Sequence, residues 1–155
     1  ESFNDAAKGS TIASTMYASG ADVIYQAAGG TGTGVFTAAK EVNEKLSADS
    51  NKKVWVIGVD RDQSAEGNYT SSDKKKSNFV LTSTIKQVGT VVKDIANDQV
   101  KGKEFEGGKT KTYGIKDGGV DIVTSSLPSD IKDAVVKAKD QIKNGELKPT
   151  DGLSK

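Results

Sequence analysis

The stretch that decides the fold is Val54-Trp55-Val56-Ile57-Gly58-Val59-Asp60-Arg61-Asp62-Gln63. Its first part is an apolar run that is rich in β-branched side chains and has no polar alternation. Such a run is typical of a strand that is buried on both faces in the middle of a parallel sheet. The polar residues that follow begin a loop at the carboxyl end of this strand. Open α/β sheets place their ligands at that end.

Apolar residues at helical spacing predict four helices around this strand. One ends before Gly20, one follows the glycine-rich turn 29–34, one begins at Thr84 with a capping-box pattern, and one runs from Pro128 to Asn144. Further short strands are predicted at 23–25, 79–81, 110–113 and 119–123, and a long polar loop at 60–78. Strands that alternate with helices indicate an α/β fold with a mainly parallel sheet and flanking helices.

Composition excludes several functional classes. The 155 residues include no Cys and no His, which removes disulfides, thiolate nucleophiles, the usual zinc sites and Ser-His-Asp catalysis. The net charge is +1, so the basic surplus that is typical of nucleic-acid binders is missing. Any acid–base chemistry would have to use Asp, Glu, Lys or Tyr.

Three segments are expected to meet at one edge of the sheet, because each leaves the carboxyl end of a strand: 25–30, 60–63 and 82–86. The glycine-rich turn lies just before the second helix, where free backbone N–H groups favour an anionic or hydroxyl-rich ligand. Its glycine spacing does not match a dinucleotide-binding or P-loop motif. The turn therefore either contacts a ligand or only connects strand and helix tightly.

Three side chains are candidates for ligand contact. Asp60 lies at a strand end, where a carboxylate can accept two hydrogen bonds from a vicinal diol or cap local N–H groups. Lys86 is expected in the first turn of a helix, a poor place for a cation, which favours a role beside Asp60 or a ligand over that of a solvated lysine. Phe3 is either a hydrophobic staple or an exposed platform for stacking.

Three classes of function fit these candidates: a hinged small-molecule binder, an enzyme and a receiver-like signalling domain. Residues 56–62 resemble the hhhhDxDx motif of haloacid-dehalogenase-like phosphatases. In that hypothesis Asp60 is the nucleophile, Mg²⁺ binds Asp60 and Asp62, and Ser83 and Lys86 complete the site. A receiver domain needs an acidic pair at an earlier strand end, and residues 25–27 contain none.

A family resemblance favours the binder. The segments Ser2-Phe3-Asn4-Asp5, Asp22 to Gly32 and Val56 to Gln63 resemble the basic membrane lipoprotein family, of the purine nucleoside receptor type. Members are substrate-binding lipoproteins of bacterial ABC importers for nucleosides. The similarity extends along nearly the whole chain and includes Leu81 to Lys86 and the C-terminal helix.

The resemblance implies a type I periplasmic-binding fold, in which two α/β lobes joined by a hinge hold a nucleoside between them. Residues 1–79 and 114–148 correspond to the C-terminal lobe, 80–113 to the hinge crossover and a helix of the N-terminal lobe, and 149–155 to a flexible tail. This chain is expected to be a fragment. Either the missing N-terminal half or a second copy should therefore cover the apolar face of the third helix, or the helix should fold back onto this lobe. The full-length protein is expected to be lipid-anchored outside the cytoplasm and to deliver its ligand to an ABC permease. The resemblance also implies no enzymatic activity, and so no catalytic residue, no metal site and no cofactor.

The resemblance also implies site residues. Phe3 matches the aromatic that stacks on the base, Gly29 lies in the glycine loop near the ligand, Asp60 matches the carboxylate that binds ribose hydroxyls, and Lys86 matches the lysine near the ribose. The other ligand-binding candidates lie in matching motifs; they are Asn4, Asp5, Gln26 and Gly30. Since half a site offers half the contacts, the isolated chain is expected to bind nucleosides no more tightly than about 1 mM.

Overall fold

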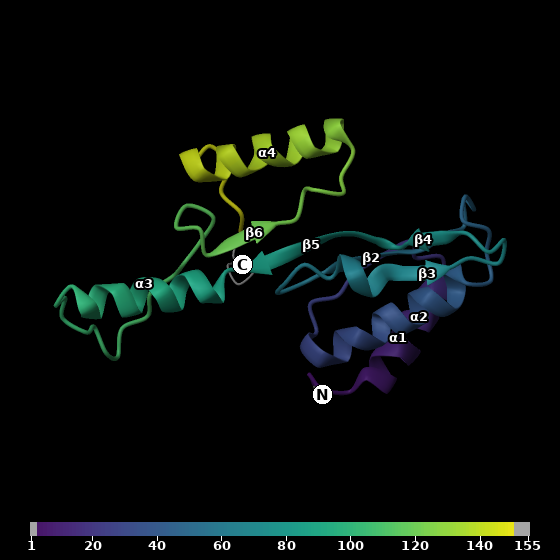
Figure 1. Cartoon of the computed structure of the whole chain (residues 1–155), viewed down its shortest axis with the longest axis horizontal. Coiled ribbons are helices and arrows are strands. Elements are labelled where there is room, and N and C mark those ends of the chain that lie inside the picture. The colour runs from purple at the N-terminus through teal and green to yellow at the C-terminus, as the bar shows by residue number, and fades with distance from the viewer. Residues whose placement is uncertain (1–2, 151–155) are drawn as a thin grey trace. The chain divides into compact units, whose positions relative to one another are not determined.

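The computed structural model describes residues 3–150, so Ser2 and residues 151–155 of the predicted tail lie outside the described residues. The chain divides into two compact units, 1–85 and 86–155. The first unit contains, in chain order, α1 (Ala6–Ala18), β1 (Val23–Tyr25), the 3₁₀ turn η1 (Gly29–Gly32), α2 (Thr33–Asn43), β2 (Trp55–Gly58), the 3₁₀ turn η2 (Ser64–Gly67), β3 (Asn68–Thr70), β4 (Lys76–Asn78) and β5 (Val80–Lys86), which ends at the boundary. The second contains α3 (Val88–Val100), β6 (Val120–Ile122) and α4 (Ser129–Asn144) (Figure 1).

The sheet of the first unit is parallel. β2 lies between β1 and β5, with Ile24 opposite Val56 and Val56 opposite Val80. Parallel neighbours need a crossover connection, and α2 supplies it between β1 and β2. The predicted fold class, an α/β fold with a mainly parallel sheet and flanking helices, is confirmed.

One face of this sheet carries the hydrophobic core. Alternate strand residues point to opposite faces, and Ile24, Val56 and Val80 are buried together with side chains of α1 and α2. The two helices lie side by side (Figure 1). On the other face Tyr25 is exposed and Ile57 is only half-buried. The prediction that β2 is buried on both faces is therefore wrong within this chain, because its helices cover one face alone.

The predicted polar loop 60–78 contains a small antiparallel hairpin. β3 pairs with β4, with Asn68 opposite Asn78 and Thr70 opposite Lys76, and Tyr69 is buried against the core. Strands of three residues are too short to show the alternation by which strands are recognised in a sequence. The hairpin was missed for that reason.

The third helix begins later than predicted. Thr84, Ile85 and Lys86 belong to β5, and α3 begins at Val88. The capping-box pattern at Thr84 is overruled because β-branched residues fit an extended strand, and the N–H of Gln87 then bonds the carbonyl of Gly119 at 2.9 Å. Residues 110–113, predicted as a strand, have no regular structure, whereas β6 lies within the predicted strand 119–123.

The second unit exposes its apolar side chains. No residue of α3 or α4 is buried, and Val88, Val92 and Ile95 are all exposed. Val91 and Ile95, with Phe105 of the following loop, line a hollow of about 390 Å³. The apolar stripe of α3 consists of Val88, Val91, Val92 and Ile95. We still predict that the missing half or a second copy covers it. Within residues 3–150, no helix is both long enough and apolar enough to cross a lipid bilayer.

An ion pair within the second unit makes stability depend on pH. Lys139 Nζ donates to Asp121 Oδ1 at 2.5 Å. This bond, and secondarily the N–H of Ile122, hold the pKa of Asp121 below its usual value. A carboxylate with a lowered folded pKa stabilises the fold above its unfolded pKa of about 3.9, and this contribution is lost as pH falls through the folded value.

We therefore expect Asp121→Asn to lower the free energy of unfolding at pH 7 by at most about 1 kcal/mol, because the pair is partly solvated. Urea denaturation should show this difference shrinking as the pH falls below about 3.9. Asp133→Asn, on the exposed surface of α4, is the matched control. A difference that stays constant down to pH 2 would show that the effect is not electrostatic.

Candidate functional site

The carboxyl ends of β1, β2 and β5 form one edge of the sheet. Tyr25 lies opposite Ile57, and Gly58 lies opposite Ser83. Beyond the pairing of β1 with β2, the N–H of Gln26 still bonds the carbonyl of Ile57 at 3.2 Å. The Tyr25 hydroxyl lies 3.1 Å from Thr84 Oγ1. Gln26, which follows β1, thus bonds to β2, and Tyr25 of β1 lies beside Thr84. The expectation that 82–86 leaves the carboxyl end of a strand is wrong, because these residues lie within β5.

The N-terminal segment lies against the glycine-rich turn. The N–H of Thr31 donates to the carbonyl of Phe3 at 2.9 Å. A Cβ atom on Gly30 would lie 2.5 Å from Asn4 Oδ1 and 3.1 Å from the Phe3 carbonyl oxygen, so a side chain here would displace Asn4, and Gly29 has a φ of +56°. The glycines therefore allow a close approach of two backbone segments. The tight-turn interpretation accounts for Gly30 without a ligand.

The Phe3 ring is 74% exposed. Its Cδ1 atom would lie 3.7 Å from a Cβ atom on Gly29, which places the ring beside the turn. A hydrophobic staple is buried against the helix that it precedes, and this ring is not. Of the two sequence-based interpretations of Phe3, the exposed platform fits the structure.

Asp5 has a structural task within the chain. It is the N-cap of α1 and accepts from the N–H of Lys8 at 2.9 Å, while its own N–H donates to Thr31 Oγ1 at 2.9 Å. Both groups tie the start of α1 to the glycine-rich turn. Asp5 thereby positions the segment that carries Phe3 and Asn4.

Asp60 begins the loop after β2, and it is exposed. Its φ is 70°, which is unusual for a residue with a side chain, and the N–H of Arg61 donates to the carbonyl of Val59 at 2.8 Å. This bond closes a three-residue γ-turn of the rarer, strained kind. Asp62, close by, accepts from the N–H of Ser64, and this bond lowers its pKa. Asp62 is thus a loop cap in this structure.

Two buried glutamines join the strand ends. Gln26 is 4% and Gln63 7% exposed, and Gln26 Nε2 donates to Gln63 Oε1 at 2.8 Å. The side chain of Gln26 is therefore engaged within the fold. Sequence reasoning assigned no role to Gln63, because a glutamine in a polar loop gives no sign that it will be buried.

The residues invoked for a phosphatase are differently placed. Ser83 is fully buried, and its Oγ accepts from the N–H of Gln63 at 3.1 Å. Lys86 is the last residue of β5 and belongs to the second unit. The expectation that it lies in the first turn of a helix is wrong, and the argument from the helix dipole falls with it. Within residues 3–150, no group of three or more acidic side chains could hold a metal ion. The phosphatase hypothesis stays a prediction.

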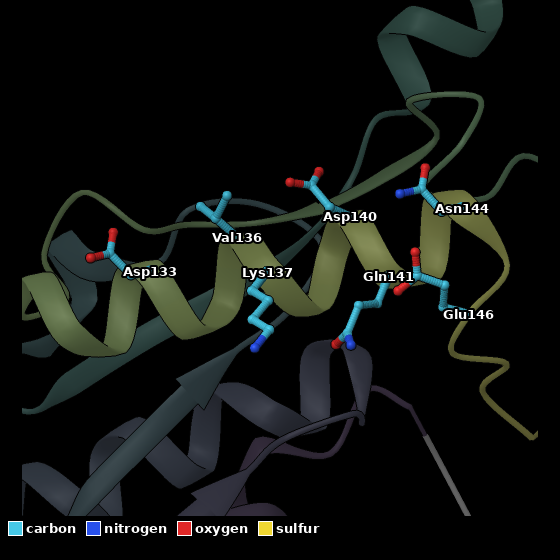
Figure 2. Close-up of a pocket in the computed structure, with 7 residues that line it drawn as sticks. All are labelled: Asp133, Val136, Lys137, Asp140, Gln141, Asn144 and Glu146. Carbon is cyan, nitrogen blue, oxygen red and sulfur yellow. The ribbon is translucent and has the colours of Figure 1, made fainter.

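A surface hollow of about 390 Å³ lies on α4. Figure 2 shows Asp133, Lys137, Asp140 and Glu146 among its lining residues, several of them with their charged ends directed away from the helix. The chain turns back at Gly145 in the left-handed conformation, with the N–H of Glu146 on the carbonyl of Gln141 at 2.9 Å. This reversal forms one wall. The hollow is a consequence of a helix ending, and it contains none of the candidate residues.

Comparison with known proteins identifies relatives of this chain. A family model described as "ABC transporter substrate-binding protein PnrA-like" matches residues 1–150. The ABC transporter nucleoside-binding protein BmpA of Lactococcus lactis subsp. cremoris is 59% identical over 146 residues. A CD4+ T-cell-stimulating antigen of Listeria monocytogenes is 45% identical, and basic membrane protein A of Borreliella afzelii is 34% identical, each over 148 residues. The alignments cover 94% of this chain but only 40–41% of these relatives.

Solved structures with the same fold are more distant in sequence. A transcriptional activator of the comK gene from Bacillus halodurans has a TM-score of 0.72 at 22% identity, over 96% of this chain and 46% of its own. A solute-binding protein of an ABC transporter system from Aeropyrum pernix has a TM-score of 0.67 at 24% identity, over 99% of this chain and 47% of its own. Both support the fold. Since the family model spans nearly all of the sequence, the chain belongs to the PnrA-like family of ABC transporter substrate-binding proteins.

Proposed function

We propose that this chain contributes one side of a nucleoside-binding site in the substrate-binding protein of an ABC importer. Two observations support the proposal: an exposed aromatic residue lies beside the turn after β1, and an exposed carboxylate follows the adjacent strand β2. The Phe3 ring lies beside the turn that follows β1, and Asp60 follows the neighbouring strand β2. A nucleoside offers a flat base for the first and a ribose diol for the second.

Each candidate residue has a role in this proposal. Phe3 stacks on the base, and Asp60 accepts hydrogen bonds from the ribose hydroxyls. Gly29 and Gly30 lie in the turn after β1 and let the ligand approach the backbone of that turn. Of the remaining candidates, Asn4 contacts the ligand, whereas Asp5 and Gln26 position the segments around it; Lys86, the first residue of the second unit, is a candidate on the family resemblance alone.

The wider role follows from the family. We propose that the full-length protein binds purine nucleosides outside the cytoplasm, is held at the membrane by a lipid and passes its ligand to an ABC permease. The chain covers about two fifths of the length of its relatives, so the opposite side of the site would come from the rest of such a protein. The same part would cover the apolar stripe of α3, with 80–113 as the crossover.

The test is isothermal titration of the full-length protein with adenosine. Wild type should bind, and Phe3→Ala should weaken binding by about 5- to 150-fold, since stacking on one ring contributes about 1–3 kcal/mol. Asp60→Asn should weaken it through loss of a charged acceptor. Phe105→Ala, at another exposed ring, is the matched control and should bind like wild type.

Two further measurements sharpen this test. Adenosine binding that is unchanged in both Phe3→Ala and Asp60→Asn would overturn the proposed site. Micromolar binding by the isolated chain would contradict the view that it holds only one side. Mg²⁺-dependent hydrolysis of an aryl phosphate that is abolished by Asp60→Asn would favour the phosphatase hypothesis instead.

A further inference from the structure

The backbone at Asp60 is held in a conformation that it would not adopt by itself. Its φ of 70° and the bond between Arg61 N–H and the Val59 carbonyl define a strained γ-turn. Residues in such sparsely populated conformations persist where their surroundings fix them, and they gather at binding sites. The residues that hold this turn in its strained conformation are therefore candidates for a role in ligand binding.

The side chain of Gln63 holds the γ-turn in place through a hydrogen bond to Val59. Its Oε1 atom accepts from the N–H of Val59 at 2.9 Å and from Gln26 Nε2 at 2.8 Å, and its own backbone N–H donates to Ser83 Oγ at 3.1 Å. Gln63 thus bonds to Gln26 after β1, to Val59 after β2 and to Ser83 within β5. Because Gln63 is nearly fully buried, water cannot replace these bonds.

The packing around this residue leaves little freedom. A Cβ atom on Gly58 would lie 2.8 Å from Gln63 Oε1 and 2.5 Å from Ser83 Oγ. A Cβ atom on Gly32 would collide with Gln26 Oε1. The amide of Gln26 therefore lies against the glycine-rich turn at one end and bonds Gln63 at the other. The two loops proposed to meet the nucleoside share one buried connection.

We propose that Gln63 is a positioning residue for ribose recognition: by holding Val59, it fixes the γ-turn that aims the Asp60 carboxylate at the ligand. This inference rests on the proposed function. It assigns no ligand contact to Gln63 itself. It predicts that changes at Gln63 alter discrimination at the ribose and leave stacking on the base as it is.

The experiment compares adenosine with 2′-deoxyadenosine in the full-length protein. Wild type should prefer the ribonucleoside. Gln63→Met keeps the length of the side chain but removes the acceptor, and we expect the preference to fall about tenfold, the scale of one charge-assisted hydrogen bond. Gln63→Glu retains an acceptor oxygen and should restore most of the preference. Gln99→Met, on the exposed surface of α3, should leave it unchanged.

A double substitution isolates the route of the effect. If Gln63 acts through Asp60, then Gln63→Met should not reduce the preference further in an Asp60→Asn background. Ser83→Ala removes another bond to Gln63 with little change in volume, and it should shift the preference in the same direction. This variant provides the test if Gln63→Met does not fold.

The outcomes separate the two proposals. A wild type that does not bind adenosine would overturn the proposed function, and this inference with it. If wild type binds and prefers ribose, but Gln63→Met and Ser83→Ala weaken both ligands equally, Gln63 is merely structural and this inference alone is overturned.

Discussion

Replacing Phe79 with alanine is expected to lower the free energy of unfolding by about 3–5 kcal/mol. Phe79 is fully buried, and its ring centroid lies 6.3 Å from that of Phe36 and 5.8 Å from that of Tyr69. It joins α2 to the β3–β4 hairpin at the centre of the first unit. Truncation removes the transfer free energy of the ring and leaves a cavity that the surrounding elements cannot fill completely.

Equilibrium denaturation of wild type and Phe79→Ala, followed by circular dichroism, measures this loss. Phe105→Ala is the control, because the Phe105 ring is 69% exposed and its removal should cost less than about 0.5 kcal/mol. Equal losses in the two variants would contradict the assignment of Phe79 to the core.

Replacing Asn43 with leucine is expected to lower the free energy of unfolding by about 2–6 kcal/mol, although leucine has the same branched side-chain skeleton. Asn43 is fully buried at the end of α2. Its Nδ2 donates to the carbonyl of Val54 at 2.9 Å, and its Oδ1 accepts from the N–H of Val54 at 3.0 Å. Leucine leaves both backbone groups of Val54 buried without partners, at about 1–3 kcal/mol each.

Two measurements distinguish this mechanism from a loss of packing. Denaturation measures the total loss of stability, and amide hydrogen exchange should show protection falling first at Val54, the residue before β2. Asn97→Leu, at an exposed position of α3, should stay within about 0.5 kcal/mol of wild type. Unchanged stability of Asn43→Leu would mean that the two bonds contribute no net stability.

The elements that sequence analysis predicted well are those with a long, regular pattern. The apolar run from Val54 to Val59 corresponds to β2, and the apolar stripes before Gly20 and before Gly145 correspond to α1 and α4. The errors lie where local signals conflict. At Thr84 a capping motif competed with β-branched residues, and the strand prevailed because tertiary pairing stabilises it.

The candidate site also contains features that the sequence predicted and features that it could not predict. The rule that loops at strand ends lie together correctly placed the turns after β1 and β2 at one edge. It could not indicate that Gln26 would be buried or that Gln63 would connect three strands. A polar residue in a loop has the same local signature whether it faces solvent or is buried in a hydrogen-bond network.

The sequence by itself determined the parallel α/β class, the exclusion of thiol and imidazole chemistry, and the segments that carry Phe3 and Asp60. The excluded chemistry follows from composition. The fold class and the candidate segments follow from patterns among residues that are close in sequence. Only the tertiary structure decided which face of β2 is covered, that the Phe3 ring stays exposed, and that Asp60 is held in a strained turn. Burial and hydrogen-bond partners depend on residues that are distant in sequence, and no local pattern contains them.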